Sequence, residues 1–408
     1  MPQIRTLTGN YAAAMAAKLA RVQAGMFFPI GPSDEVMETF QHLIDTGEAT
    51  NAKVYQLENE KSNMGAQIAF ARLGIRTMGC TCAEGTLWPA SETRYASGSR
   101  LPLVVVIPSR AIGPPTTVNP DHDDFMAQTV MGWMQFYCED GQDVLDTLLQ
   151  AYRIAEDRRV LLPAFVAYEG WEISHGSYKV VVPDQEAVDR FLPPRAVSPD
   201  KDYAAVDWKE RLSHRRTYPG RYVEYMDKKY VMVRALKEAT GVIEEIGKEY
   251  AETFDSHYVG LLEPYRCDDA DLVFVTMGFI TPTVRFVVDG LRDEGVRAGV
   301  LKIRTYRPFP ERAIADILGR AKVAVIIERN SLEMVFRDVR SALYATASPP
   351  LIMGRAVGIG GRRVSTYDIM KIAQEGADAL KTGKIEKEYD WEPIKTLDFD
   401  PFEEDVLD

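Results

Sequence analysis

The amino-acid sequence predicts an α/β fold that is built on parallel sheets and divided between two domains. Short, fully apolar runs alternate with amphipathic stretches along most of the chain, and the clearest run, residues 103–107, reads Leu-Val-Val-Val-Ile. A strand that is apolar on both faces is typical of a parallel sheet covered by helices on each side. With 408 residues, the chain also exceeds the usual size of a single hydrophobic core.

The first 184 residues alternate between predicted strands and helices. Residues 8–22 place apolar side chains on one helical face, with Asn10 available as the N-cap. Ser33 can cap the next helix, whose first acidic residues suit the positive end of the helix dipole. Residues 114–124 are rich in Pro, Asp and His, so we expect a loop too polar for the core. The other elements expected here are strands at 25–30, 52–57, 75–80, 103–107 and 160–167, and helices at 34–45, 61–73, 83–97 and 142–157.

The rest of the chain is expected to contain a linker, a long charged helix at 222–253 and a second α/β domain. The final residues are acidic and aromatic without a clear period, so we expect them to fray or to wrap a neighbour. The second domain is expected to contain strands at 271–276, 300–303 and 323–328 and helices at 281–294 and 311–321. The predicted divisions are a first domain at 1–184, a linker and helix at 185–260, a second domain at 261–385 and a tail at 386–408.

Charge and composition exclude several classes of protein. The formal net charge of -12 argues against nucleic acid or an anionic membrane as a partner. No apolar run approaches the roughly 18 residues that cross a bilayer, and the first residues lack a signal-peptide core, so we expect a cytoplasmic protein without a membrane partner. Disulfides are not expected there, and a lone Cys-x-Cys pair offers too few ligands for a metal, so no metal is expected on this chain. The cysteines are Cys80, Cys82, Cys138 and Cys267.

Four residues follow predicted strands of the first domain, namely Gly31, Glu60, Thr81 and Arg110. The carboxyl ends of parallel strands meet at one edge of a sheet, where ligands bind, so we expect these residues to lie close together. Glu60 begins a helix rich in Gly and Ala, where a partly buried carboxyl group can take part in proton chemistry. Plainer interpretations stay open: Glu60 could serve only the helix dipole, and Arg110 could form an ordinary ion pair. Glu58 is the alternative acid.

Short motifs along the chain resemble, in order and spacing, those of one enzyme family. They are Gly9-Asn10-Tyr11-Ala12-Ala13-Ala14, Phe28-Pro29-Ile30-Gly31-Pro32-Ser33, Glu58-Asn59-Glu60 with Gly74-x-Arg76, Asp121-His122-Asp123-Asp124 with Gly132-Trp133, Tyr306-Arg307-Pro308-Phe309-Pro310 and Glu328-Arg329-Asn330. Nearly the whole chain resembles the alpha subunit of the thiamine-diphosphate-dependent 2-oxoacid:acceptor (ferredoxin) oxidoreductases, such as pyruvate:ferredoxin oxidoreductase. The resemblance implies a domain that binds the aminopyrimidine ring of thiamine diphosphate, followed by a transketolase C-terminal-like α/β domain.

The resemblance also implies roles for particular residues. Glu60 would hydrogen-bond the aminopyrimidine ring of the cofactor, and Arg110 would hold the carboxylate of the substrate. The residues implied to contact the cofactor are Glu60, Thr81, Pro29 and Ile30, and those implied to contact the substrate are Gly31, Arg110, Phe28 and His122. His122 has an alternative interpretation as a simple surface residue.

Two departures from the family pattern bear on these roles. Cys82-Ala83-Glu84 replaces the more usual Ser-Gly-Pro, which weakens the assignment of Thr81. Gly31 stands where the family commonly has Thr, and the loss of that side chain opens space. One interpretation is a tight turn. The other is a pocket enlarged for an aromatic 2-oxoacid, as in phenylglyoxylate dehydrogenase, with pyruvate, branched-chain 2-oxoacids and indolepyruvate as alternatives.

The sequence lacks the Gly-Asp-Gly signature for magnesium and diphosphate, and it lacks a run of cysteines for iron–sulfur clusters. The resemblance therefore implies a beta subunit that holds the diphosphate, Mg²⁺ and a [4Fe-4S] cluster. Gamma and ferredoxin-like delta subunits, or a flavin/NAD subunit, would carry the electrons, and coenzyme A would be the co-substrate. Alternative functions are half of a lipoamide-linked 2-oxoacid dehydrogenase or of a transketolase-like enzyme, and a non-catalytic scaffold on the same fold.

Overall fold

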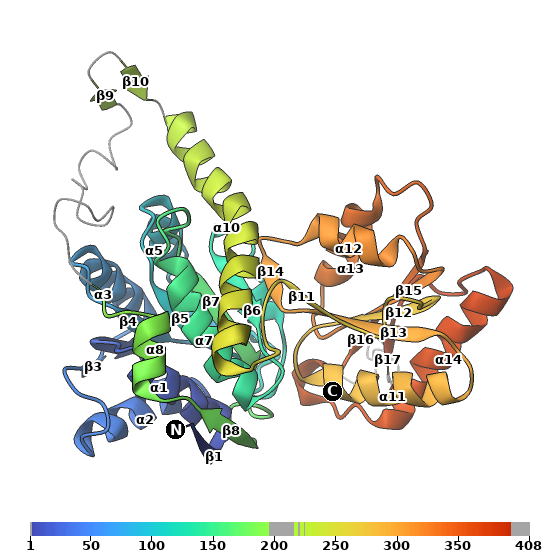
Figure 1. Ribbon diagram of the computed structural model, residues 1–408, viewed down its shortest axis with the longest axis horizontal. Helices are drawn as coiled ribbons and strands as arrows, with labels where there is room; N and C mark the ends of the chain where they lie inside the picture. Colours follow the sequence, from blue (N-terminus) through green and yellow to red (C-terminus); the bar gives the residue numbers. More distant parts are fainter. Residues whose placement is uncertain (1, 196–215, 219–220, 224, 393–408) are drawn as a thin grey trace, which may run out of the picture.

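The computed structural model describes residues 2–195, 216–218, 221–223 and 225–392. Figure 1 shows two α/β units side by side, with the long helix α10 (Tyr225–Phe254) between them and its N-terminal end projecting from the first unit. Each unit contains a largely parallel sheet, so the predicted α/β class is confirmed. Among the described helices, none is long and apolar enough to span a bilayer.

The first sheet has seven strands in the order β14-β6-β7-β5-β4-β2-β3, all parallel except β14. Successive side chains of a strand point to opposite faces, so Val104 and Val106 pack into one apolar cluster and Val105 and Ile107 into another. The strands are β2 (Ala24–Phe27), β3 (Lys53–Gln56), β4 (Thr77–Cys80), β5 (Val104–Ser109), β6 (Met134–Tyr137), β7 (Ala164–Glu169) and β14 (Thr305–Arg307). The sequence analysis did not anticipate β6 and β14, which are short and pair with each other across the chain.

Helices cover both faces of this sheet. The helices on the first face are α1 (Gly9–Leu19), α2 (Asp34–Asp45) and α7 (Gly141–Ala155), and α8 (Gln185–Phe191) and α10 add to this layer. The helices on the second face are α3 (Glu60–Arg72) and α5 (Ala90–Gly98), with the short α4 (Glu84–Leu87) and α6 (Asp123–Met126) nearby. A separate antiparallel pair contains β1 (Gln3–Thr8) and β8 (Ser177–Val182), and another contains β9 (Arg216–Tyr218) and β10 (Arg221–Val223).

Two predicted helix caps are wrong. Thr8, not Asn10, caps α1 by accepting a hydrogen bond from the N–H of Tyr11, while the buried Asn10 amide donates to the carbonyl of Pro32 at 2.9 Å. Ser33 occupies the N-cap position of α2, but its hydroxyl donates to the carbonyl of Ile30. The single helix expected at 83–97 is divided into α4 and α5 at Pro89, which has no N–H to continue the helical ladder.

The second sheet has six strands in the order β11-β13-β12-β15-β16-β17, and only β11 is antiparallel to its neighbour. The strands are β11 (Leu262–Tyr265), β12 (Leu272–Thr276), β13 (Ala298–Ile303), β15 (Val323–Glu328), β16 (Leu351–Val357) and β17 (Tyr389–Glu392). Its helices are α12 (Glu311–Leu318) and α13 (Met334–Leu343) on one face and α11 (Thr281–Asp293) and α14 (Thr366–Thr382) on the other, with the 3-10 turns η1 (Gly278–Ile280) and η2 (Ile359–Gly361). The expectation that the tail frays is wrong for β17, and residues 393–408 lie outside the described residues.

The two units share a continuous core. One apolar cluster runs from the second face of the first sheet to α12 and α13 of the second unit. A buried ion network adds to this join, because the ammonium of Lys302 in β13 lies 2.9 Å from a carboxylate oxygen of Asp143 in α7. Arg304 reaches the other oxygen of Asp143 at 2.8 Å. The division of the chain into the expected domains stays a prediction. One strand crosses it, because β14 comes from the second half of the chain and joins the first sheet.

The loop expected to be too polar for the core is in fact partly inside it. Asp121, His122 and Asp124 are all buried at the join between the units. Their burial is tolerated because distant groups supply hydrogen bonds, such as Glu169 for His122 at 3.2 Å. Local polarity therefore predicted the loop but not its location.

Candidate active site

The loops that follow β2, β4 and β5 are tied to one another at a single edge of the first sheet. The thiol of Cys82, after β4, lies 3.4 Å from the carbonyl oxygen of Gly31, after β2. The N–H groups of Ala83 and Arg110, after β4 and β5, both donate to one carboxylate oxygen of Asp124. The structure thus brings the loops carrying Gly31, Thr81 and Arg110 together, as the parallel-sheet argument predicts.

Glu60 is the first residue of α3, and its side chain is only 4 % exposed. The helix start does not require its carboxylate, because the Asn59 side chain caps α3 by accepting from the N–H of Ser62 at 2.8 Å. Oε2 of Glu60 is buried and has no hydrogen-bond partner among the described residues. A buried acceptor left without a partner costs about 1–3 kcal/mol, and more if charged, and the contact of Glu60 with the cofactor stays a prediction.

Glu58, the alternative acid, has a different environment. Its side chain is exposed and accepts a hydrogen bond from the hydroxyl of Ser62, which lowers the pKa of the Glu58 carboxyl. A solvated, hydrogen-bonded carboxylate has no need of a further partner. The geometry therefore favours Glu60 over Glu58 as the acid that meets a cofactor.

Thr81 and Gly85 face Glu60 across a narrow space. The Thr81 side chain is buried, and its Oγ1 has no hydrogen-bond partner in the described structure. A Cβ added to Gly85 would overlap Thr81 Oγ1 and would lie 2.9 Å from Oε1 of Glu60. Gly85 thus lets the backbone of α4 pack closely against the two polar side chains. The sequence analysis missed this role, although the glycine four residues after Thr81 was visible at the expected helix start.

Arg110 is mostly buried and only loosely paired. Its side chain is 14 % exposed, and its Nη2 lies 3.8 Å from a carboxylate oxygen of Glu84, which is longer than a hydrogen bond. Nε of Arg110 is buried without a hydrogen-bond partner among the described residues. A guanidinium with unused donors at the edge of a sheet can bind an incoming carboxylate, and the weak pair with Glu84 does not compete strongly.

Gly31 is exposed and has open space beside it. A Cβ at this position would meet only a carboxylate oxygen of Asp34, at 3.9 Å. Gly31 is absent from the residues with positive φ, so the turn does not require glycine for its backbone conformation. In the same loop Phe28 and Ile30 are half-buried and Pro29 is exposed. Residues 31–33 do form a turn, so the turn and the enlarged pocket both stay open as interpretations of Gly31.

His122 is fully buried, so the interpretation as a surface residue is wrong. Its ring lies 4.3 Å from the ring of Tyr137, centroid to centroid, and its Nε2 faces Glu169. Burial lowers the pKa of His122, although the carboxylate of Glu169 opposes this effect. Oε1 of Glu169 also accepts the N–H of Phe279 from the second unit. These contacts place His122 at the join between the units, and its contact with substrate stays a prediction.

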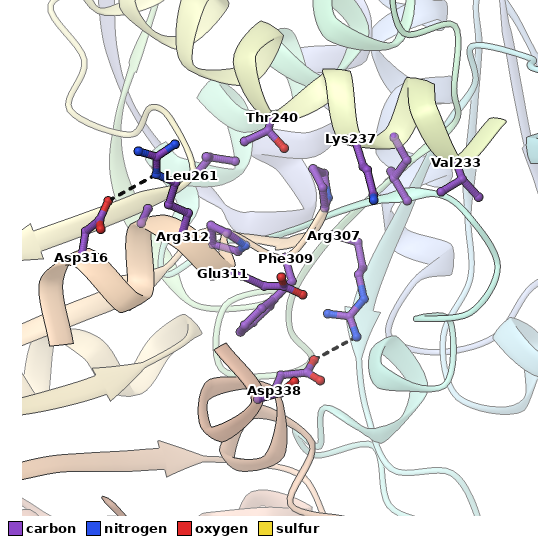
Figure 2. A pocket seen from close by; sticks show the side chains of 15 residues that line it. Val233, Lys237, Thr240, Leu261, Arg307, Phe309, Glu311, Arg312, Asp316 and Asp338 are labelled. Atoms are coloured by element: carbon purple, nitrogen blue, oxygen red, sulfur yellow. Dashed lines mark hydrogen bonds and ion pairs between the residues drawn. The ribbon is translucent and has the colours of Figure 1, made fainter. Parts of the chain in front are cut away.

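A groove of about 670 Å³ lies elsewhere, between α10, α12 and the segment after β14 (Figure 2). Arg307-Pro308-Phe309-Pro310, the last four residues of the motif that begins at Tyr306, form part of its wall. Its charges are largely paired, as Arg307 and Asp338 show at 2.9 Å in Figure 2. None of the residues that line the groove belongs to the Glu60 cluster. In the part of the chain that the structure describes, no group of three or more His, Cys, Asp or Glu side chains is placed to hold a metal ion.

The fold and the site together define the class of protein. A chain of the split-gene transketolase aligns over 92% of this chain and 99% of its own, with a TM-score of 0.54 and 13% sequence identity. The 2-oxoglutarate:ferredoxin oxidoreductase of Magnetococcus marinus, solved with 2-oxoglutarate, coenzyme A and succinyl-CoA bound, aligns over 91% of this chain and 65% of its own, with a TM-score of 0.72 and 15% identity. These likenesses identify the α/β fold of thiamine-diphosphate-dependent enzymes.

Sequence comparisons identify the family. The family described as "Pyruvate flavodoxin/ferredoxin oxidoreductase, thiamine diP-bdg" matches residues 15–251, and "Pyruvate:ferredoxin oxidoreductase core domain II" matches residues 270–369. The chain belongs to the pyruvate flavodoxin/ferredoxin oxidoreductase family. The predicted resemblance to its alpha subunits and the predicted thiamine diphosphate are confirmed.

Several relatives match the chain over nearly its whole length. Ketoisovalerate oxidoreductase subunit VorA of Pyrococcus horikoshii is 36% identical over 97% of this chain and 99% of its own. Pyruvate synthase subunit PorA of Pyrococcus furiosus is 35% identical over 96% of this chain and 98% of its own. VorA of Pyrococcus furiosus is 37% identical over 97% of this chain and 99% of its own.

The residues of the cluster fit the cofactor of the family. Glu60 Oε2 and Thr81 Oγ1 are buried polar atoms that lack partners in the described structure, and Gly85 packs closely against both side chains. An aminopyrimidine ring has ring nitrogens that accept a hydrogen bond from a carboxyl group and an amino group that donates one. The cluster can therefore hold the ring of thiamine diphosphate, while the individual residue contacts stay predictions.

Proposed function

We propose that this chain is the alpha subunit of a coenzyme-A-acylating 2-oxoacid:acceptor oxidoreductase that acts on a small aliphatic 2-oxoacid. The observation that carries the proposal is the buried side chain of Glu60, whose Oε2 has no partner in the described structure and whose Oε1 lies beside Gly85, in the thiamine-diphosphate-binding part of the chain. The reaction converts a 2-oxoacid, coenzyme A and an oxidised acceptor into acyl-coenzyme A, carbon dioxide and the acceptor reduced by two electrons.

Glu60 supplies a hydrogen bond from its carboxyl group to the aminopyrimidine ring of the cofactor. Because Asn59 caps α3, both oxygens of Glu60 are free of the helix start. Burial keeps water away from this carboxyl and strengthens its hydrogen bond, since the local dielectric is low. When bound, thiamine diphosphate supplies the carbon centre that attacks the 2-oxo group and accepts the electrons released by decarboxylation.

Arg110 binds and orients the substrate. Its planar guanidinium matches the carboxylate of a 2-oxoacid, and its separation of 3.8 Å from Glu84 leaves donors for the incoming anion. A bound carboxylate holds the 2-oxo carbon in one place, which lowers the entropic cost of reaction. Gly31 leaves open space in a neighbouring loop, where the substrate side chain would lie.

The relatives support a small aliphatic substrate. PorA of Pyrococcus furiosus is named for pyruvate and VorA of Pyrococcus horikoshii for ketoisovalerate, whereas neither name points to an aromatic acid. Pyruvate and 2-oxoisovalerate are therefore the first candidates. An aryl 2-oxoacid such as phenylglyoxylate is the second candidate, and the open space at Gly31 is the observation that favours it.

The proposed complex includes partner subunits. A beta subunit holds the diphosphate, Mg²⁺ and a [4Fe-4S] cluster, and gamma and ferredoxin-like delta subunits pass electrons to ferredoxin. A flavin/NAD subunit would replace that route if NAD is the acceptor. Coenzyme A as the acyl acceptor is supported by the structural relative that contains coenzyme A and succinyl-CoA.

The test is anaerobic dye reduction by the native complex with coenzyme A and thiamine diphosphate, using pyruvate, 2-oxoisovalerate, indolepyruvate and phenylglyoxylate in parallel. Glu60→Gln keeps the shape of the side chain and removes its exchangeable proton, so turnover should fall by about 100-fold or more while the complex assembles. Glu58→Gln is the matched control, because that side chain is exposed, and it should retain activity. Full activity of Glu60→Gln would favour the scaffold interpretation, and a requirement for a lipoyl acyltransferase would favour the dehydrogenase.

A further inference from the structure

Asp124 joins the two loops that carry Thr81 and Arg110. Its Oδ2 accepts hydrogen bonds from the N–H of Ala83 at 2.8 Å and from the N–H of Arg110 at 3.1 Å. These groups follow β4 and β5, which are neighbours in the sheet. The side chain of Asp124 is fully buried, so both bonds are shielded from competing water.

The backbone at Ala83 explains why such a bond is needed. Ala83 has φ 48° and ψ -129°, a conformation that glycine adopts readily and that a Cβ disfavours. The alanine here therefore carries backbone strain that a glycine would not. The bond from the N–H of Ala83 to Asp124 holds the loop in this conformation, immediately before α4 and Gly85.

The segment that carries Asp124 is itself held by the second unit. The N–H of His122 donates to the carbonyl of Arg329 at 2.9 Å, and the ring of Phe125 packs 6.0 Å from that of Tyr306, centroid to centroid. On the opposite side, the hydroxyl of Thr86 in α4 donates to the carbonyl of Asp124 at 3.2 Å. The segment of Asp124 is thereby fixed on both sides.

We propose that Asp124 is a positioning residue. It fixes the loop of Thr81 relative to the substrate-binding Arg110 by accepting one hydrogen bond from the backbone of each loop. This inference rests on the proposed function, since it concerns the same site. In this role Asp124 acts through the N–H groups of Ala83 and Arg110. Its loss should weaken binding more than it slows the bound complex.

The experiment compares Asp124→Ala, Asp124→Asn and the double variant A83G/D124A in the native complex. Two lost buried hydrogen bonds should raise the Kd for thiamine diphosphate, measured by equilibrium dialysis, and the KM for the 2-oxoacid by about 10-fold to 30-fold each, with kcat changed less. Asp124→Asn keeps an acceptor oxygen and should stay within about threefold of the unmodified complex. A83G/D124A should recover most of the lost affinity, because glycine adopts the backbone conformation at position 83 without the hydrogen bond to Asp124.

Asp123→Ala is the matched control. Asp123 also accepts two hydrogen bonds, from the N–H and the hydroxyl of Ser331, but it joins the two units and does not hold the site loops. Asp123→Ala should lower the Tm of the complex without changing the Kd for thiamine diphosphate or the KM for the 2-oxoacid. The proposal is overturned if Asp124→Ala leaves both constants unchanged, if A83G/D124A is no better than Asp124→Ala, or if neither of these variants assembles. If Glu60→Gln loses turnover, the proposed function stands even where the proposal for Asp124 fails. If Glu60→Gln keeps full activity, the proposed function itself fails.

Discussion

Replacing Gly85 by alanine tests the space between Glu60 and Thr81. The added Cβ would overlap Thr81 Oγ1 and would lie 2.9 Å from both Cγ and Oε1 of Glu60, whereas ordinary van der Waals contact begins near 3.4 Å. The Glu60 side chain can rotate away at its far end. Thr81 is β-branched and has few alternative χ1 rotamers, so the overlap with its hydroxyl is the harder one to relieve.

The free-energy cost of this overlap can be compared with that of methyl groups added elsewhere in protein interiors. Added methyl groups in packed interiors typically cost about 1–3 kcal/mol. At about 1.4 kcal/mol for each factor of ten, Gly85→Ala should weaken thiamine diphosphate binding or lower kcat/KM by about 5-fold to 150-fold. Equilibrium dialysis measures the first quantity, and anaerobic dye reduction measures the second.

Gly290→Ala provides the control for this substitution. Gly290 lies in α11 of the second unit, where an added Cβ meets no atom within 4 Å. Alanine is the better helix former by about 1 kcal/mol, so this variant should raise the Tm slightly and leave activity unchanged. A Gly85→Ala complex with full affinity and full rate would refute the argument that Glu60 and Thr81 share a cofactor site.

Three further predictions follow from the same geometry. Arg110→Lys keeps the charge but loses the planar fork, so the KM for the 2-oxoacid should rise by about 10-fold or more, and an unchanged KM would exclude Arg110 from the substrate site. Gly31→Thr should leave the Tm unchanged, because little lies near its Cβ, and should lower kcat/KM for 2-oxoisovalerate more than for pyruvate; equal effects would place the substrate side chain elsewhere. Burial raises the pKa of Asp124 from 3.8 to about 7. A raised carboxyl pKa stabilises the fold at low pH and loses that effect as pH rises from about 4 to about 7, so Asp124→Asn should flatten the decline in Tm between about pH 4 and pH 7, and parallel curves would contradict this.

The fold class and the approximate strand positions were predictable because the signals are local. An all-apolar run such as that within β5 (Val104–Ser109) indicates a strand buried on both faces, whatever packs against it. The gathering of Gly31, Thr81 and Arg110 followed from the same argument, because parallel strands place their carboxyl ends at one edge. In contrast, β6 and β14 are short and pair across 169 or more positions of the chain, so no local pattern marks them.

Sequence alone therefore determined the α/β class, the family and the residues at the ends of the strands, since hydrophobic period and motif spacing are properties of neighbouring residues. Only the tertiary structure decided which polar groups are buried and which lack partners. Asp124 was visible as part of an acidic loop, but its proposed positioning role depends on two N–H groups supplied by other loops. Likewise, Glu60 is distinguished from Glu58 by burial and by an unpartnered oxygen. Burial and hydrogen bonding are set by distant segments meeting in space, and this information is absent from any local stretch of sequence.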